Sequence, residues 1–338
     1  MTAQRKVAVF GAYGHTAGFI IAELLQRGLQ PVPSGRDRAR LEALARHLAL
    51  DGRQASIDDP ASLDCALAGC VAVIHCAGPY GDSAVPVIES ALRAGIHYLD
   101  LSAEQQATLH TFDHFDHAAR QAGSTLLPSM AFYGGLADLL ATAAFGDWPD
   151  ADRIDIAVAL DRWHPTAGTR RTGARNTAPR QVIGDGRLTL LADPPPTCAW
   201  TFPAPFGTQS MVALPLSEII TLSRHLHSRE VHSHMNLAPL RDLRDPATPP
   251  PQPADARGRS AQRFAMEARV SRNGTTRHAL AQGRDIYAIS APLVVEALQR
   301  LLRGDARPGV LAPGDAFDAA DMLGAIADLQ VTIANGRG

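Results

Sequence analysis

The sequence predicts an α/β protein in which a doubly wound parallel sheet is followed by an inserted, mainly antiparallel α+β domain. Three observations support this fold class. Short apolar runs alternate with helical patterns over the first 128 residues. From about residue 151 apolar and polar residues alternate with a period of two, as in residues 154–158. The adjacent Asn273 and Gly274 separate two such alternating segments, which is a strong signal for a β-hairpin.

The first half of the chain predicts six strands joined by helices. Residues 71–76 are apolar throughout, as expected for a strand buried on both faces. Ser83 is a candidate N-cap for the helix that follows it. The predicted strands are residues 7–10, 30–34, 54–57, 71–76, 97–101 and 125–127. The predicted helices start near residue 16 and stop at 28, and then span 37–46, 60–67, 83–93 and 103–121. Such a sheet places its ligand crevice beyond the carboxyl ends of the first and fourth strands.

The second half predicts longer strands, a surface loop and one further helix. Residues 264–270 alternate in polarity like residues 154–158. The proline-rich residues 244–256 predict a long surface loop. A helix is expected to begin at Pro292 and to end at Gly304, with an apolar face along residues 293–301.

The amino-acid composition limits which classes of protein the chain can belong to. With 338 residues, 46% hydrophobic and 20% charged residues, and a net charge of −2, the chain can form two ordinary domains and offers nothing to a nucleic acid. No apolar run has the length of a membrane span, and no signal peptide precedes the first strand. The four cysteines form no Cys-x-x-Cys pair, so neither a zinc site nor a disulfide framework is predicted. We therefore expect a cytoplasmic location, with no membrane partner.

Lysine usage restricts the mechanism. Lys6 is the only lysine in the chain, and it precedes the first strand, at the end of the sheet away from the crevice. A Schiff-base lysine or a Tyr-x-x-x-Lys dyad is therefore excluded.

The most informative motif is a glycine turn between the first strand and the first helix. Gly11 allows a sharp turn, and Gly14 lets the backbone approach a pyrophosphate. Ala17 keeps helix and strand close together, and the helix N-terminus offers free N–H groups to phosphate. This context is typical of a Rossmann dinucleotide-binding domain, although a plain tight turn is the alternative.

The end of the second strand indicates which dinucleotide binds. NAD-binding domains carry an acidic residue at this position, whereas this chain has Ser34, Gly35 and Arg36 before Asp37. A guanidinium here can pair with the 2′-phosphate of NADP. We therefore predict NADP over NAD. A basic, solvated helix start is the alternative reading, disfavoured because positive charge there opposes the helix dipole.

Two further segments should border the crevice. Ala77, Gly78, Pro79 and Tyr80 follow the fourth strand, and the glycine allows close approach to a ligand. Tyr80 is a candidate hydrogen-bond donor to substrate, or else it packs against the first loop.

At the end of the fifth strand, three polar residues are candidates for orienting substrate: Asp100, Ser102 and Glu104. The competing explanation is that Ser102 caps the next helix and Glu104 stabilises its first turn.

Four segments together resemble the saccharopine dehydrogenase (saccharopine reductase-like) family. They are residues 11–17, 34–37, 76–81 and 95–104. Residues 166–169 resemble a family segment in the substrate domain, and residues 283–287 to 309–313 resemble the C-terminal part of trans-acting enoyl reductases. Ala17 replaces the family's usual third glycine, residues 131–139 follow the family only loosely, and the substrate domain is short. The resemblance implies a Rossmann domain, an inserted substrate domain and a C-terminal return to the first domain.

We accordingly divide the chain into an NADP-binding domain (1–130), a substrate and dimerisation domain (131–288) and C-terminal helices that return to the first domain (289–338). The resemblance implies NADP(H)-linked reduction of an imine or an activated C=C bond in a small metabolite, by a homodimer. Two alternatives stay open: a non-catalytic NADPH-binding regulator, and an NADP-linked dehydrogenase of a hydroxy or amino acid.

Candidate site residues follow from these motifs. Hydride transfer depends mainly on positioning, and a proton donor is also needed for some acceptors. The catalytic candidates are Tyr80, Tyr133, His164 and Arg170, and Arg170 or Arg171 can clamp a carboxylate or phosphate. The cofactor-binding candidates are Gly11, Tyr13, Gly14, His15, Thr16, Ala17, Ser34, Arg36, Asp37, Ala77, Gly78, Pro79 and Ser102.

Histidines form two groups with spacings that a metal could use. His110, His114 and His117 would share one helix face, and residues 225–234 carry two His-x-His patterns. No cysteine or third acidic ligand supports the second group. We predict solvated histidine-rich surfaces and no metal site.

Overall fold

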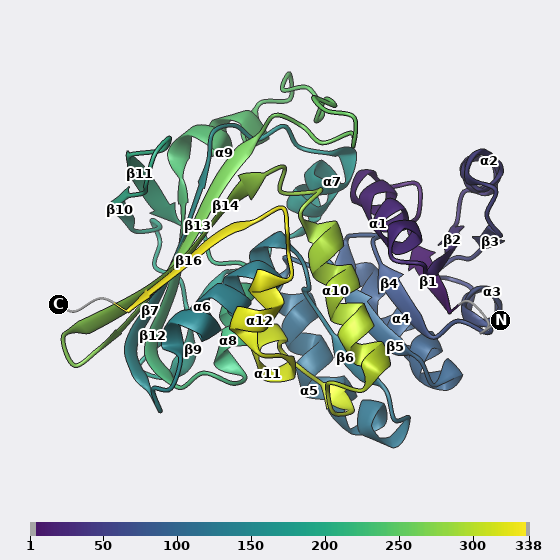
Figure 1. Cartoon of the computed structure of the whole chain (residues 1–338), viewed down its shortest axis with the longest axis horizontal. Coiled ribbons are helices and arrows are strands. Elements are labelled where there is room, and N and C mark those ends of the chain that lie inside the picture. The colour runs from purple at the N-terminus through teal and green to yellow at the C-terminus, as the bar shows by residue number, and fades with distance from the viewer. Residues whose placement is uncertain (1–4, 336–338) are drawn as a thin grey trace.

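The computed structural model describes residues 5–335 and contains two sheets, one on each side of the molecule in Figure 1. The first sheet has seven strands, all parallel, in the order β15-β6-β5-β4-β1-β2-β3. They are β1 (Lys6–Phe10), β2 (Gln30–Gly35), β3 (Arg53–Gln54), β4 (Ala72–His75), β5 (His97–Asp100), β6 (Thr125–Leu127) and β15 (Gly309–Val310). The order reverses between β1 and β4, so the predicted doubly wound sheet is confirmed.

Both faces of this sheet are covered by helices, which is why Val7–Phe10 of the central strand β1 are apolar and buried on both sides. Val7 and Val9 pack in one core cluster with α1 and α10, while Ala8 and Phe10 pack in the other with α3, α4 and α5. The helices are α1 (His15–Gln26), α2 (Arg38–Leu48), α3 (Pro60–Leu67), α4 (Tyr80–Ala94), α5 (Gln105–Gln121) and α10 (Ser290–Arg303).

The predicted start of the helix after the fourth strand is wrong, and α10 begins at Ser290, two residues before the predicted Pro292. Helix α4 begins at Tyr80, three residues before Ser83, whose hydroxyl donates to the carbonyls of Ala77 and Pro79 instead of capping the helix. The physical reason is a cap supplied from another element. The Glu104 carboxylate accepts hydrogen bonds from the N–H groups of Tyr80 (2.8 Å) and Gly81 (3.1 Å).

The second sheet is mainly antiparallel, as predicted. Its main path is β10-β11-β12-β7-β13-β14-β16; off this path, β8 pairs with β12, and β9 pairs with β8. Within this sheet, β7 and β12 are the only parallel pair among the described residues, and every other pair is antiparallel. The strands are β7 (Ala151–Leu160), β8 (Gln181–Gly184), β9 (Arg187–Leu190), β10 (Thr197–Thr201), β11 (Thr208–Ala213), β12 (Ser228–Asn236), β13 (Arg263–Arg272), β14 (Thr275–Arg284) and β16 (Gln330–Asn335).

The predicted hairpin joins β13 to β14. Asn273 and Gly274 both adopt positive φ (49° and 78°), and Arg272 pairs with Thr275, as a two-residue hairpin turn requires. The predicted surface loop is also present, because residues 245–262 contain neither helix nor strand. The remaining helices are the π-helix η1 (Phe132–Leu136), α6 (Ala137–Phe145), α7 (Ala167–Arg175), α8 (Glu218–Ser223), α9 (Leu237–Arg244), α11 (Pro313–Ala316) and α12 (Ala319–Gly324).

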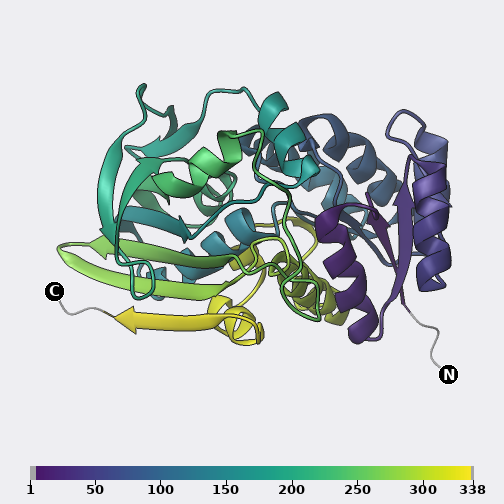
Figure 2. The same cartoon turned by 90° about the horizontal axis from the view of Figure 1, so that it is seen from above.

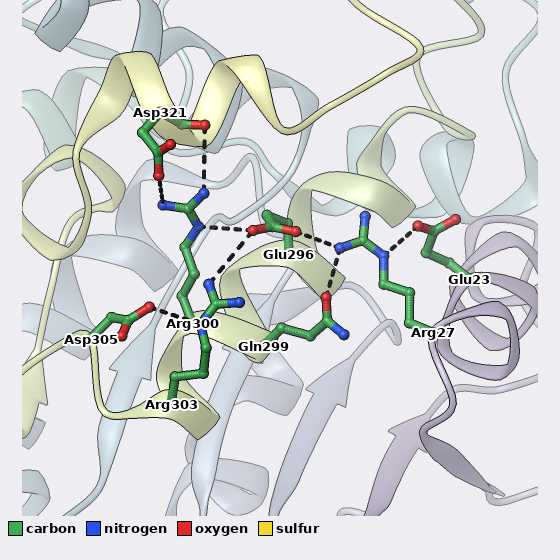
Figure 3. A network of polar contacts seen from close by, with 8 residues as sticks. All are labelled: Glu23, Arg27, Glu296, Gln299, Arg300, Arg303, Asp305 and Asp321. Carbon is green, nitrogen blue, oxygen red and sulfur yellow. Dashed lines mark hydrogen bonds and ion pairs between the residues drawn. The ribbon is translucent and has the colours of Figure 1, made fainter.

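The C-terminal segment contributes to both sheets. Helix α10 lies against α1, and β15 extends the first sheet beside β6, whereas β16 pairs with β14 in the second sheet (Figures 1 and 2). A network of charged side chains fastens this packing (Figure 3). Glu296 of α10 accepts hydrogen bonds from Arg27, at the end of α1, and from Arg300 (2.9 Å), and Arg300 continues to Asp321 of α12.

Candidate active site

A cavity of about 1190 Å³ lies where the carboxyl ends of β1, β2, β4 and β5 face the second domain. This is the crevice expected at the reversal of strand order. The first domain contributes the loops after these four strands. The second domain contributes α7, residues 212–216, α9 and the neighbourhood of Tyr287. The two domains therefore share one cavity.

The glycine turn forms the floor of the cavity. Gly11 has φ +84°, and a Cβ on it would lie 2.7 Å from the Cβ of Ala77. A Cβ on Gly14 would lie 3.2 Å from the Gly11 carbonyl oxygen. Helix α1 begins here with neither a side-chain cap nor an acidic residue in its first turn. The backbone and the free helix N–H groups thus fit the pyrophosphate of a dinucleotide.

Tyr13 and two arginines form one end of the cavity. The Tyr13 hydroxyl accepts a hydrogen bond from the Asp37 N–H (3.0 Å), and the Arg40 guanidinium lies 4.5 Å from the centre of its ring. Asp37 caps α2 through the Arg40 N–H (3.0 Å), so one of its two carboxylate oxygens is engaged within the helix. Arg36 is exposed beside them. This arrangement fits a 2′-phosphate.

Most predicted cofactor-binding residues line the cavity, and two do not. Ala17 is buried where α1 packs on the sheet. Ser34 is also buried, and its carbonyl accepts the N–H groups of Gly11 (2.8 Å) and Ala12 (3.0 Å), so it shapes the glycine turn from below. The lining residues are Gly11, Tyr13, Gly14, His15, Thr16, Arg36, Asp37, Ala77, Gly78, Pro79 and Ser102.

A buried polar chain supports the loops from behind. Asp100 accepts hydrogen bonds from the N–H groups of Ser102 (2.9 Å) and Ser129 (2.7 Å) and from the Tyr98 hydroxyl (2.9 Å), which in turn contacts His75 (3.0 Å). Burial raises the pKa of Asp100 to about 6 and lowers the pKa of His75 to about 3. Asp100 does not line the cavity, so this chain positions the loops and does not orient substrate.

Ser102 and Glu104, predicted to orient substrate at the end of β5, already form hydrogen bonds within the first domain. Glu104 lines the cavity, but both of its oxygens accept N–H groups of α4. The Ser102 hydroxyl accepts the Glu104 N–H (3.0 Å). Helix α5 begins at Gln105 with Glu104 as its N-cap residue and has no side-chain cap, so the predicted cap by Ser102 is wrong. The Glu104 carboxylate instead caps the neighbouring helix α4.

None of the four catalytic candidates presents an acidic proton to the cavity. Tyr80 turns its hydroxyl inward to the His75 carbonyl (3.3 Å), and burial raises the pKa of that hydroxyl. Tyr133 lines the cavity, but its hydroxyl is buried without a hydrogen-bond partner in the described residues, and burial again raises its pKa. His164 does not line the cavity, whereas its neighbours Trp163 and Thr166 do.

Arg170, the fourth candidate, forms hydrogen bonds with backbone carbonyl groups. Its guanidinium donates to the carbonyls of Leu243 (3.4 Å), Asp245 (3.0 Å) and Thr248 (2.9 Å). It therefore fastens the proline-rich loop to α7. Arg171 lines the cavity, is exposed, and forms no ion pair within the described chain.

The substrate-domain wall contains residues that the sequence did not single out. Tyr287 fixes the start of α7, because its hydroxyl contacts Trp163 Nε1 (3.0 Å) and the Thr169 hydroxyl (3.0 Å). Arg180 lines the cavity beside an apolar wall. No local pattern marks these residues, since their surroundings come from segments more than 30 positions apart in the chain.

The histidine groups hold no metal cluster in residues 5–335, where no three His, Cys, Asp or Glu side chains are placed to bind one ion. His225 instead contacts the buried Asp138 carboxylate at 3.2 Å, and His232 contacts Glu230 at 2.9 Å. In the same range, no helix is both long and apolar enough to cross a membrane.

The fold and the cavity define a two-domain dinucleotide-binding protein of Rossmann type. Residues 7–127 match the family described as "Saccharopine dehydrogenase NADP binding domain". This match, over about a third of the chain, supports an NADP-binding domain of the saccharopine dehydrogenase type with NADP as the cofactor. The resemblance and the cofactor predicted from the sequence are thereby confirmed.

Solved structures resemble the chain over its full length. Apo saccharopine dehydrogenase (L-Glu forming) from Saccharomyces cerevisiae matches with a TM-score of 0.70 and 14% identity, covering 98% of this chain and 100% of that one. Amine dehydrogenase from Mycobacterium smegmatis matches with a TM-score of 0.52 and 13% identity, covering 93% and 96%. At these identities the likeness concerns the fold. No curated protein matches the sequence significantly.

Proposed function

We propose that the protein is an NADP(H)-dependent oxidoreductase that reduces an imine or an activated C=C bond of a small metabolite. One observation carries the proposal: the cofactor loops and the second domain line a single cavity of about 1190 Å³. A site for one drug-sized ligand holds about 300–1,000 Å³. The cavity therefore has room for a dinucleotide and a second molecule in contact with it.

The chain's residues act by positioning. The turn at Gly11 and Gly14 and the start of α1 bind the pyrophosphate, and Arg36 and Arg40 bind the 2′-phosphate. NADPH supplies the hydride when it is bound. The wall formed by Trp163 and Tyr287 excludes water from the acceptor, which favours hydride transfer over side reactions.

An imine fits the cavity better than a C=C bond. A protonated imine that accepts a hydride at carbon becomes a neutral amine, and no further proton is required. A C=C bond that accepts a hydride leaves a carbanion or enolate, which needs a proton from a nearby acid. The hydroxyls of Tyr80 and Tyr133 are turned away or buried, so an acceptor that brings its own proton is favoured.

The same observation favours a second candidate, a protein that binds NADPH without turnover. The discriminating experiment follows NADPH absorbance at 340 nm with cyclic imines, with 2-oxo acids plus amines, and with enones. Oxidation in at least one imine-forming mixture supports the proposal. Stabilisation by NADPH with no oxidation across the whole panel contradicts it and supports the binding protein.

The cofactor site has its own test, with a matched control. Arg40 lies over Tyr13 in the cavity, whereas Arg38 pairs with Glu42 (2.7 Å) outside it. Arg40→Gln should weaken NADPH binding about tenfold, the value of about one charge-assisted hydrogen bond, and should leave NADH binding unchanged. Arg38→Gln should change neither. Equal losses for the two variants would contradict the role of Arg40.

The homodimer and the cytoplasmic location remain predictions from the sequence. Light scattering on the purified protein tests the first. A single species at twice 35.9 kDa is expected, and a monomer at all concentrations would refute the dimer.

A further inference from the structure

Basic side chains, but no acidic ones, line the half of the cavity that the described second domain forms. The acidic residues that line the cavity are Asp37, Asp82 and Glu104, and all three belong to the first domain. Each is engaged: Asp37 caps α2, Asp82 pairs with Arg175 (2.7 Å), and Glu104 caps α4. No carboxylate from the described second domain lines the cavity, whereas several arginines do.

Among these arginines, Arg180 stands out by its surroundings. Its side chain is half-buried, and one of its N–H groups donates to the Pro215 carbonyl (2.8 Å). It forms no ion pair with any described residue. Burial lowers its pKa, and the charge of Glu218 partly offsets this effect. Glu218 is buried, does not line the cavity, and accepts the Leu216 N–H (2.8 Å). A guanidinium has five N–H donors, so most of those on Arg180 are unmatched.

Apolar side chains line the same half of the cavity as Arg180. Leu214 and Leu216 flank Pro215, whose carbonyl accepts the Arg180 N–H, and Leu240 and Leu243 of α9 also line this half. A partly desolvated charge beside aliphatic side chains is costly unless an opposite charge joins it. A carboxylate would satisfy two guanidinium N–H groups at once, which is the strongest pairing that arginine makes.

From these observations we infer that the second-domain half of the cavity binds a carboxylate on a mainly aliphatic body, and that Arg180 holds the carboxylate. The inference rests on the proposed function and specifies its substrate class: a monocarboxylate whose apolar part lies along Leu214, Leu216, Leu240 and Leu243. Arg180 is thus a specificity-determining residue. It is not assigned a part in the hydride or proton transfer.

The test uses the full chain saturated with NADPH and titrates it calorimetrically with hexanoate, hexanamide and acetate. Hexanoate should bind at least tenfold more tightly than hexanamide, which lacks the charge, and than acetate, which lacks the aliphatic body. Equal affinity for hexanoate and hexanamide would overturn the inference. So would equal affinity for hexanoate and acetate, because the apolar wall would then contribute nothing.

Variants assign the effect to Arg180. Arg180→Gln should lower hexanoate affinity at least tenfold, to the level of hexanamide, and leave NADPH affinity within twofold. The control is Arg244→Gln, since Arg244 lines the same half of the cavity but is exposed, and it should change hexanoate affinity less than twofold. Equal losses for both variants, or a loss of NADPH affinity in Arg180→Gln, would overturn the assignment.

A second variant keeps the inference testable if Arg180→Gln does not fold. Arg180→Lys keeps the charge and loses the paired N–H geometry, so it should bind hexanoate more weakly than the parent protein and more tightly than it binds hexanamide. A lysine variant that binds both ligands equally would refute the inference. Because the titrations need no turnover, their failure is distinguishable from a failure to oxidise NADPH.

Discussion

Two of the seams along which the first domain meets the rest of the chain differ in burial. The α10 seam joins α1, α10 and α12 through Arg27, Glu296 and Arg300, whose side chains are only 10–18% exposed (Figure 3). The α7 seam joins α7 to α4 through one ion pair, Arg175 with Asp82, with exposures of 61% and 47%. Helix α7 has no buried residue at all.

The difference indicates which side of the cavity opens. Breaking a buried charge network is costly, whereas an exposed ion pair contributes about 0–1 kcal/mol. The α7 seam also borders the cavity, because a Cβ on Gly78 would lie 2.8 Å from the Thr172 hydroxyl. We therefore expect ligands to enter and leave beside α7 while the α10 seam keeps the domains together.

The largest effect is expected at the α10 seam. Glu296→Gln leaves Arg27 and Arg300 without their shared carboxylate, although each keeps one other acid. Breaking a buried pair costs about 3–5 kcal/mol, so a loss of about 2–3 kcal/mol in the free energy of unfolding is expected in urea. Asp305→Asn removes an exposed partner of Arg303 in the same network and should cost less than about 1 kcal/mol. Equal losses of unfolding free energy in the two variants would show that burial does not make the Glu296 contacts stronger than the Asp305 contact.

A pH-dependent effect of intermediate size tests the burial of Glu218, which does not line the cavity. Glu218 of α8 is almost fully buried, and burial raises its pKa from 4.5 to about 7. The folded state therefore binds the proton that the unfolded state has already lost, and stability falls as pH rises from about 4.5 to about 7. At about 1.4 kcal/mol per pH unit this amounts to roughly 2 kcal/mol between pH 5 and 8.

Glu218→Gln removes this dependence, because the amide does not titrate. The variant and the parent protein should have similar stability at pH 5, and the variant should be relatively more stable at pH 8. Urea unfolding at both pH values measures the difference. A difference that does not change with pH would mean that Glu218 titrates normally and that its surroundings are hydrated.

The smallest effect on stability, and the most direct test of the comparison, concerns the α7 seam. Arg175→Ala should lower stability by less than about 1 kcal/mol. It should nevertheless speed NADPH dissociation several-fold in stopped-flow fluorescence, because α7 opens more readily. Asp82→Ala should behave alike, the double variant should add nothing, and exchanging the two charges should restore the parent rate. An unchanged dissociation rate in all four would place the entry elsewhere.

The first sheet was predictable because its signals are local. Apolar runs such as residues 71–76 and the turn at Gly11 each carry their structure within a few positions. The start of α4 was mispredicted because its cap, Glu104, lies 24 positions away from Tyr80. Strand β15 has two residues, too few for any period to be visible.

The site divides in the same way. Gly11, Gly14 and Arg36 line the cavity because the motif itself fixes where a turn or strand ends. His164 stands in a segment that does border the cavity, yet its position relative to Trp163 and Thr166 depends on tertiary contacts with Tyr287. Arg180 acquires its significance from Pro215 and from the leucines around it, which only the folded chain brings together.

Placing β15 beside β6 has a consequence for synthesis. Residues 5–130 emerge from the ribosome long before residues 290–310. Until then, β6 has no neighbouring strand on one edge, and the face of α1 that packs against α10 is uncovered. Unpaired edges and exposed apolar faces invite association with other chains. The first domain is therefore complete only when most of the chain has been made, and a fragment ending near residue 130 is expected to aggregate.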